Sequence, residues 1–170
     1  MLKTFCTVWS PFAPEKAGDR ILIPMVIAGC LLGYPLASTA MEQQVAPDAF
    51  PHTTSGTAGG MTQIPGAIVP RGQGIPDASC LGFASAQANH HLQLKTSPST
   101  LTFTVESFVA NIDTTLVVKT PNGQWVCSDD GQGTGQNATL TLDAPIAGDY
   151  QIWVGTFDSG ETVDYELRLD

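Results

Sequence analysis

From Cys80 to the end of the chain, large apolar residues alternate with polar ones in short runs. A period of two places successive side chains on opposite faces of a strand, one facing a core and one facing water. Turn sequences such as Thr120-Pro-Asn-Gly123 separate the runs. The alternation occurs in residues 92–95, 101–106, 115–118, 125–127, 139–142, 150–154 and 164–169. This spacing predicts an all-β domain over residues 80–170, an antiparallel β-sandwich of about seven strands.

An apolar segment near the N-terminus predicts export. Residues 21–36 are mostly apolar, basic residues precede them, and the small residues Ala37-Ser-Thr-Ala40 follow. That order is typical of a signal peptide, here residues 1–40, and the run is too short and too interrupted by Pro and Gly for a comfortable membrane span. Within the run, Ile27-Ala-Gly-Cys30 resembles the lipobox of bacterial lipoproteins. The alternative is therefore a lipoprotein signal that ends before Cys30, with a lipid on that cysteine.

These two outcomes place the protein differently. Cleavage after Ala40 predicts a periplasmic or extracellular protein, whereas acylation of Cys30 predicts one anchored to the envelope. In both cases the chain meets a membrane only through its signal peptide or its lipid anchor.

Residues 41–79 have a different composition. Five prolines are spread among Gly, Thr, Ser and Ala, and there is no helical or alternating period. Such a segment buries too little apolar surface to offset its ordering entropy, so we expect a flexible linker. Ile64, Ile68 and Val69 are the residues of this segment that could dock on the domain.

Cysteine usage agrees with export. The chain has four cysteines, and removal of residues 1–40 leaves Cys80 and Cys127. An even pair in an oxidising compartment predicts a disulfide, and the alternative is two buried free thiols. Closing a loop of roughly 48 residues contributes about 4 kcal/mol in the chain-entropy model.

The charge of the exported part is strongly negative. Residues 41–170 carry four basic and fourteen acidic side chains, for a net charge of −10. This surface repels nucleic acid, which excludes a DNA- or RNA-binding role. It suits a soluble extracellular domain or a protein that binds cations.

Three motifs occur in order in the C-terminal half. They are Asp113-Thr-Thr-Leu-Val-Val-Lys-Thr-Pro-Asn-Gly123, Ser128-Asp-Asp-Gly131 and Ala147-Gly-Asp-Tyr-Gln-Ile-Trp-Val154. Over about residues 90–170 the chain resembles the bacterial pre-peptidase C-terminal domain. The resemblance implies a jelly-roll-like β-sandwich that accompanies secreted enzymes, often proteases, and is not itself catalytic. It also implies that calcium or a substrate polymer is the kind of ligand to consider.

The acidic loop after residue 128 is the candidate metal site. Asp129 and Asp130 could ligate calcium together with Asp113 or Asp158. Adjacent carboxylates repel one another, and a divalent cation relieves that repulsion. The alternative is a solvated hairpin loop in which the aspartates form Asx turns. The segment leading into the sandwich supplies ligands in calcium-binding members of the family, but here it holds only two well-separated aspartates.

Aromatic residues and histidines are the other candidates. Trp125 and Trp153 could form a binding surface for a protein or a glycan. The alternation places Trp153 on the outer face of its strand, although core filling or covering an edge is the alternative, above all for Trp125. His90 and His91 are neighbours on a strand and face opposite sides, so they cannot easily bind one metal.

Sequence motifs for catalysis are missing. The chain has no G-x-S-x-G, H-E-x-x-H, P-loop or dinucleotide fingerprint. We therefore expect an exported, non-catalytic β-sandwich module that binds a protein or polysaccharide partner, with calcium as its candidate cofactor. The alternatives are a structural envelope protein tethered through Cys30 and a small hydrolase.

Overall fold

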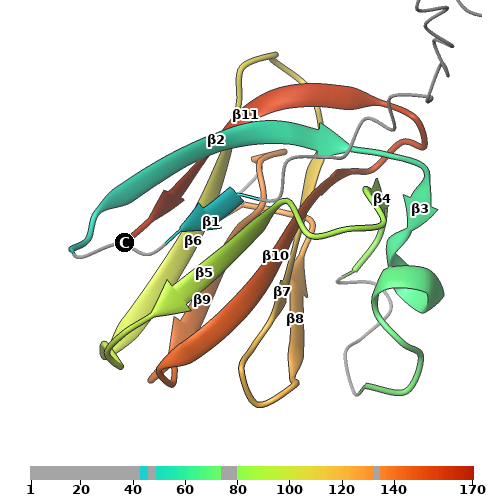
Figure 1. Cartoon of the computed structure of the whole chain (residues 1–170). Coiled ribbons are helices and arrows are strands. Elements are labelled where there is room, and N and C mark those ends of the chain that lie inside the picture. Colours follow the sequence, from blue (N-terminus) through green and yellow to red (C-terminus); the bar gives the residue numbers. More distant parts are fainter. Residues whose placement is uncertain (1–42, 46–48, 74–79, 132–134) are drawn as a thin grey trace, which may run out of the picture. The chain divides into compact units, whose positions relative to one another are not determined.

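Two β-sheets packed face to face form the domain (Figure 1). The computed structural model describes residues 43–45, 49–73, 80–131 and 135–170. The predicted all-β sandwich is confirmed. The predicted signal segment, residues 1–40, and the lipidation candidate Cys30 lie outside the described residues. No helix in the described part of the chain is long and apolar enough to cross a membrane.

The described residues form eleven strands, more than the seven that the alternation predicts. Each predicted run forms a strand, and these are β5 to β11. Four further strands, β1 to β4, and one turn with π-helical hydrogen bonding, η1, precede them. The bounds are β1 Gln43–Val45, β2 His52–Gly59, β3 Thr62–Gln63, η1 Ile64–Ile68, β4 Phe83–Ala84, β5 His90–Leu94, β6 Thr100–Ser107, β7 Thr114–Lys119, β8 Trp125–Ser128, β9 Thr139–Asp143, β10 Gly148–Thr156 and β11 Thr162–Leu169.

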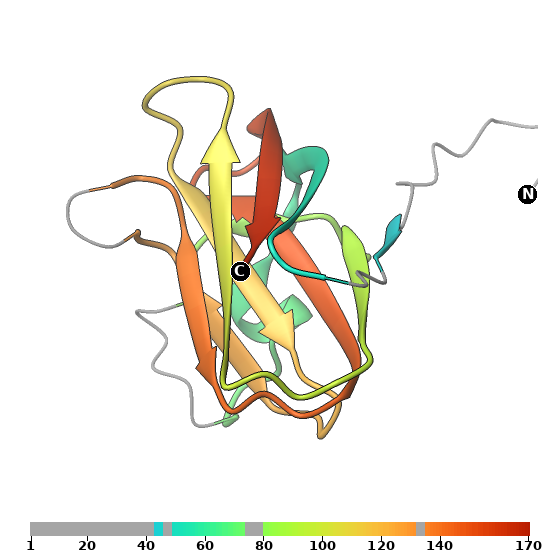
Figure 2. The same cartoon turned by 90° about the vertical axis from the view of Figure 1, so that its left-hand side faces the viewer.

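The four-stranded sheet has the order β2-β11-β6-β9, and all its neighbouring strands are antiparallel. In the seven-stranded sheet β10 is central. One edge of β10 pairs with β5 and, further along, with β4. Its other edge pairs with β7, which in turn pairs with β8. β3 completes this sheet beside β4, and β1 lies parallel to β5. Figure 2 shows the sheets as two layers, with the loop after β6 at one end of the strands.

One apolar cluster, the inter-sheet core, lies between the two layers. It consists of inward-facing residues of both sheets, which the period of two predicts. Its members are Ala58, Leu92, Leu94, Leu101, Phe103, Val105, Leu116, Val118, Ala138, Leu140, Tyr150, Ile152, Val154, Val163, Tyr165, Leu167 and Leu169.

A second cluster, the outer core, covers the other face of the seven-stranded sheet. Val117 of β7 and Trp153 of β10 point away from the inter-sheet core, so these central strands are buried on both faces. The segment around η1 folds over them, and the amide of Val69 donates to the carbonyl of Ile64 at 2.9 Å. The outer core consists of Ile64, Ile68, Val69, Cys80, Ala84, Ala88, Val117, Cys127 and Trp153.

The prediction that residues 41–79 form a flexible linker is wrong for residues 52–69. All eight residues of β2 pair with β11, and β3 and η1 follow directly. The inward positions of β2 are Thr54, Gly56 and Ala58, which are too small or too polar to show an apolar alternation. A Cβ at Gly56 would lie 2.7 Å from the Tyr165 hydroxyl, so the ring of Tyr165 occupies the space that a larger side chain would fill. The docking predicted for Ile64, Ile68 and Val69 is confirmed.

Candidate binding surface

The acidic loop and several other loops meet at one end of the sandwich. β6 and β10 end there, and β7 and β11 begin there. Backbone hydrogen bonds join the loops: Phe157 N donates to Asp113 O at 3.0 Å, and Gly160 N donates to Gly60 O at 2.9 Å. We call this the loop end, and it comprises residues 60–61, 81–82, 108–113, 129–131, 135–138 and 157–161.

All four predicted metal ligands lie at the loop end. Asp113 directly precedes β7, Asp129 and Asp130 follow β8, and Asp158 follows β10. Burial is the main cause that raises the pKa of Asp113, and the negative charges of Asp130, Asp129, Asp158 and Glu161 raise it further. The structure therefore groups the predicted carboxylates around Asp113.

Glu161 is a member of this acidic group that sequence reasoning did not select. It lies in the turn between β10 and β11, three residues after Asp158. The pattern of turn residues at 158–161 predicts the turn, but only the pairing of β10 with β7 brings the turn to Asp113. Glu161 could therefore be found only from this long-range strand pairing, which the local sequence does not contain.

The acidic group does not form a preassembled metal centre. No three His, Cys, Asp or Glu side chains in the described ranges are placed to hold a metal ion together. Asp113 Oδ1 is buried and has no hydrogen-bond partner, which is costly for a carboxylate oxygen. Calcium therefore stays a prediction: its preferred ligand type, the carboxylate, is present, and an ion would need six to eight oxygens around it.

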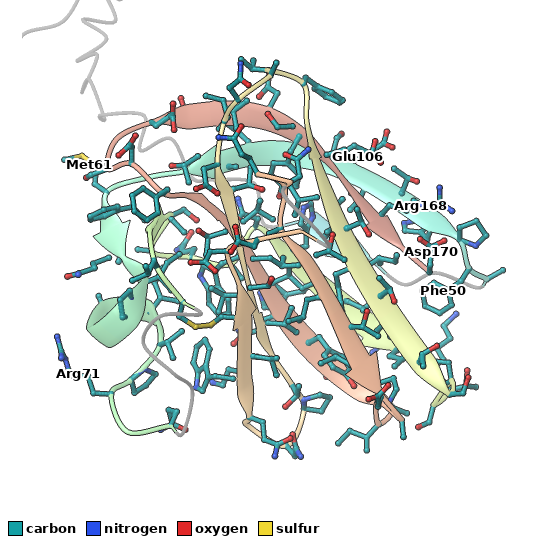
Figure 3. All side chains as sticks on the ribbon, turned by 180° about the vertical axis from the view of Figure 1, so that it is seen from behind. Phe50, Met61, Arg71, Glu106, Arg168 and Asp170 are labelled. Atoms are coloured by element: carbon teal, nitrogen blue, oxygen red, sulfur yellow. A yellow bond between two sulfur atoms is a disulfide. The ribbon has the colours of Figure 1, made fainter. Side chains whose placement is uncertain are left out.

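Exposed apolar side chains also gather at the loop end. Six large apolar side chains of the described residues are exposed, and five of them lie at this end. The sixth, Ile146, precedes β10 and lies at the opposite end. Figure 3 shows Met61 at the edge of the domain. The five, with their exposed fractions, are Met61 (83%), Phe108 (67%), Val109 (54%), Phe157 (47%) and Leu81 (37%).

Of the two residues in the predicted binding surface, Trp153 is not exposed. Trp153 points to the outer face as the alternation predicts, but it is buried in the outer core under the segment around η1. Trp125 is half-buried, with its ring centroid 5.4 Å from that of Trp153. The Lys119 ammonium lies 5.2 Å from the Trp125 centroid. The indole of Trp125 thus already contacts Trp153 and a cation, which leaves less of it open to a sugar.

His90 is a buried histidine that connects the two sheets. Its Nε2 lies 2.6 Å from the hydroxyl of Tyr165, and the two rings meet edge to face with centroids 5.8 Å apart. Burial lowers the pKa of His90 from 6.5 to about 4, so the imidazole is neutral at physiological pH. His91 lies on the opposite face and is partly exposed, in agreement with the expectation that the two do not share a metal.

The predicted disulfide is confirmed. Cys80 and Cys127 are bonded, with their Cα atoms 5.2 Å apart. The bond joins the chain just before β4 to β8, and both cysteines belong to the outer core.

No protein-family model matches the chain, and no curated protein sequence matches it. Among solved structures, it is similar to the pre-peptidase C-terminal domain of a collagenase from Bacillus anthracis, with a TM-score of 0.46, 15% identity, and coverage of 76% of this chain and 96% of that domain. This is the family that the sequence motifs resemble.

A second similar structure is CorA, a surface-associated copper-binding protein of Methylomicrobium album BG8. Its TM-score is 0.46 with 11% identity, and the match covers 76% of this chain and 98% of that protein.

Proposed function

We propose that this protein is an exported, non-catalytic β-sandwich module that binds a partner protein through its loop end. The observation that carries the proposal is the concentration there of five exposed large apolar side chains. Soluble domains rarely gather exposed apolar residues on one surface unless that surface meets another molecule. Aromatic side chains such as Phe108 and Phe157 are also the type that supplies most binding energy in protein interfaces.

Export is supported by the Cys80–Cys127 disulfide, because such bonds persist in oxidising compartments. A tether through Cys30 is a separate proposal. Mass spectrometry of the mature N-terminus tests it, since an acylated Cys30 and a chain beginning after Ala40 have different masses.

A binding role is favoured over catalysis by the chemistry of the loop end. Its titratable groups in the described ranges are carboxylates that repel one another around Asp113. His90, one of the three histidines of the chain, is enclosed between the sheets and hydrogen-bonded to Tyr165. A protein partner is favoured over a glycan because Trp153 is buried and Trp125 is half-buried against it, whereas the apolar side chains of the loop end are open to solvent.

Site-specific photo-crosslinking in the organism that produces the protein tests this proposal. A photoreactive amino acid replaces Phe157 in one variant and Ile146 in a matched control, because both side chains are nearly equally exposed, at 47% and 46%. We expect a discrete protein adduct from position 157, and we expect Phe108→Ser in the same chain to weaken it. Identical adducts from positions 157 and 146, or no adduct at the loop end, would contradict the proposal.

A further inference from the structure

Three carboxylates lie on the solvent face of the four-stranded sheet, close to the loop end. Glu106 of β6 is directly opposite Glu166 of β11, and Asp164 of β11 is directly opposite Thr57 of β2. All three face solvent, because the residues that alternate with them belong to the inter-sheet core. We call Glu106, Asp164 and Glu166 the acidic strip.

Within the described part of the chain, the acidic strip has one cation on its own face, Arg168. Like charges directly opposite in a sheet are destabilising, so the Glu106–Glu166 pair brings the isolated domain no benefit. Glu106 and Glu166 both help to raise the pKa of Arg168, after the larger effect of Asp170. Its guanidinium is already committed, since Nε and Nη2 each donate to Asp170 at 2.8 Å.

The other basic residues of the described ranges lie elsewhere. Lys119 ends β7 and Lys95 follows β5, both at the end of the sandwich opposite the loop end. Figure 3 shows Arg71 on the far side of the domain from Glu106, whereas Arg168 and Asp170 lie next to each other. Arg168 alone cannot balance three carboxylates while it is paired with Asp170, so a further cation for the strip has to come from another molecule.

A groove beside the strip combines an apolar wall with a negative charge. It has a volume of about 300 Å³ and is lined by Ser55, Gly56, Thr57, Phe108, Asp164 and Tyr165. The amide of Phe108 donates to the carbonyl of Asp164 at 3.0 Å, which fixes the exposed aromatic residue next to the carboxylate. Thr57 Oγ1 donates to Asp164 Oδ1 at 2.8 Å and orients the carboxylate.

This combination matches the side chain of arginine or lysine. Such a side chain has an apolar stem and a cationic end, so its stem can contact the Phe108 ring while its charge meets Asp164. A bare metal ion fits less well, because the carboxylates of the strip are spread along two strands and no described group of three is placed to hold a metal.

We propose that a basic segment of the partner protein docks along the acidic strip, with one arginine or lysine side chain in the groove between Phe108 and Asp164. This inference rests on the proposed function and adds the chemistry of the partner: cationic residues interspersed with apolar ones. The apolar residues meet the loop end, and the cations meet Glu106, Glu166 and Asp164.

Fluorescence anisotropy with the full chain, purified after export, tests the inference. The probe is a fluorescein-labelled twelve-residue peptide that contains Arg and Leu, and its counterpart has Glu in place of every Arg. The strip variant is Glu106→Gln with Glu166→Gln. The matched control is Asp143→Asn with Asp149→Asn, which removes the same charge from two exposed positions at the opposite end.

We expect the Arg peptide to bind and the Glu peptide not to bind. The strip variant should weaken binding about tenfold, and the control variant should change it less than twofold. Equal losses in both variants would mean unspecific attraction to an acidic protein and would overturn the inference, as would absence of binding. Self-association that the strip variant abolishes, or calcium binding without peptide binding, would assign the strip to another occupant and overturn it as well.

Failure of this inference can be told apart from failure of the proposed function. If the photo-crosslink from position 157 persists in the strip variant at full yield, the loop end binds a partner without a basic segment, and only the inference is wrong. If no partner crosslinks at the loop end, the proposed function is wrong, and the inference that rests on it falls too.

Discussion

The two apolar clusters use opposite faces of the same central strands, yet they are closed in different ways. The inter-sheet core is enclosed by regular strands on both sides, and most of its members are fully excluded from solvent. The outer core has a sheet on one side and, on the other, a chain segment with a single turn, η1. The disulfide belongs to the outer core. The bond ties Cys80, an outer-core residue outside the strands, to Cys127 of β8.

The largest effect is expected in the inter-sheet core. Phe103 is fully buried in β6, so Phe103→Ala leaves a cavity between the sheets and should lower the free energy of unfolding by about 3–5 kcal/mol. Urea denaturation measures the loss. Ile68→Ala, in the outer core at 8% exposure, is the comparison and should cost about 2 kcal/mol, because the cover can settle onto the smaller side chain. If Ile68→Ala lowered the free energy of unfolding more than Phe103→Ala, the outer core would contribute more to stability than the inter-sheet core, contrary to this prediction.

Removal of the disulfide should affect the outer core selectively. Replacing both Cys80 and Cys127 by alanine should cost at most about 4 kcal/mol, because the bond closes a loop with a sequence separation of 47 residues. In hydrogen exchange, amides of the cover such as Val69 should lose protection while those of β6 keep most of theirs. Equal loss of protection in both regions would show that the two cores unfold as one unit.

The same contrast explains which strands could be predicted. Strands β5 to β11 show the period of two because their inward residues fill the inter-sheet core. β2 belongs to the same sandwich but escapes the pattern, since Tyr165 of its neighbour fills the space above Gly56. The cover of the outer core has no period because it lies on the sheet as a turn, and Trp153 looks exposed in the sequence because residues far from it in the chain bury it.

The candidate site was predictable in part for the same reason. The grouping of Asp113, Asp129 and Asp130 follows from the hairpin of β7 and β8, which is local in sequence. Glu161 and the exposed ring of Phe157 reach the same place only through the pairing of β10 with β7. Exposure of an apolar residue depends on what the whole fold leaves uncovered, so no local pattern identifies it.

The next largest effect on stability is expected from pH, through the buried contact between His90 and Tyr165. The pKa of His90 is 6.5 when unfolded and about 4 when folded, so between these values the unfolded chain binds a proton that the folded chain does not. The stability that the neutral His90 side chain contributes to the fold is complete above pH 6.5. It is lost as the pH falls from 6.5 to about 4, and the total loss in the free energy of unfolding is about 3 kcal/mol. Urea denaturation at pH 7 and pH 5 measures the slope.

One glutamine variant isolates that slope from the titration of the carboxylates. His90→Gln keeps a polar side chain opposite Tyr165 but does not titrate, so stability should depend less on pH than in the native chain. Parallel pH profiles for the native chain and His90→Gln would show that the buried imidazole does not control acid stability.

The smallest effect is expected at Asp113, which directly precedes β7, the strand that contributes to both cores. Its raised pKa means that the folded state holds the carboxyl proton more tightly than the unfolded state does, so ionisation at rising pH destabilises the fold. Asp113→Asn removes the charge and keeps an acceptor at Oδ1. It should therefore raise the stability at pH 7 by less than about 1 kcal/mol, because solvent screens the neighbouring carboxylates.

Thermal melting with millimolar calcium or with a chelator completes this test. Asp143→Asn, at the opposite end, removes one charge far from the acidic group and should leave the melting temperature nearly unchanged. An ion bound only by the folded state raises the melting temperature, and Asp113→Asn should abolish that rise if the ion sits among the loop-end carboxylates. A midpoint that calcium does not move would remove the metal prediction. The stability gained by Asp113→Asn would then measure only the repulsion among the loop-end carboxylates. This repulsion destabilises the fold at the same end where five apolar side chains are exposed.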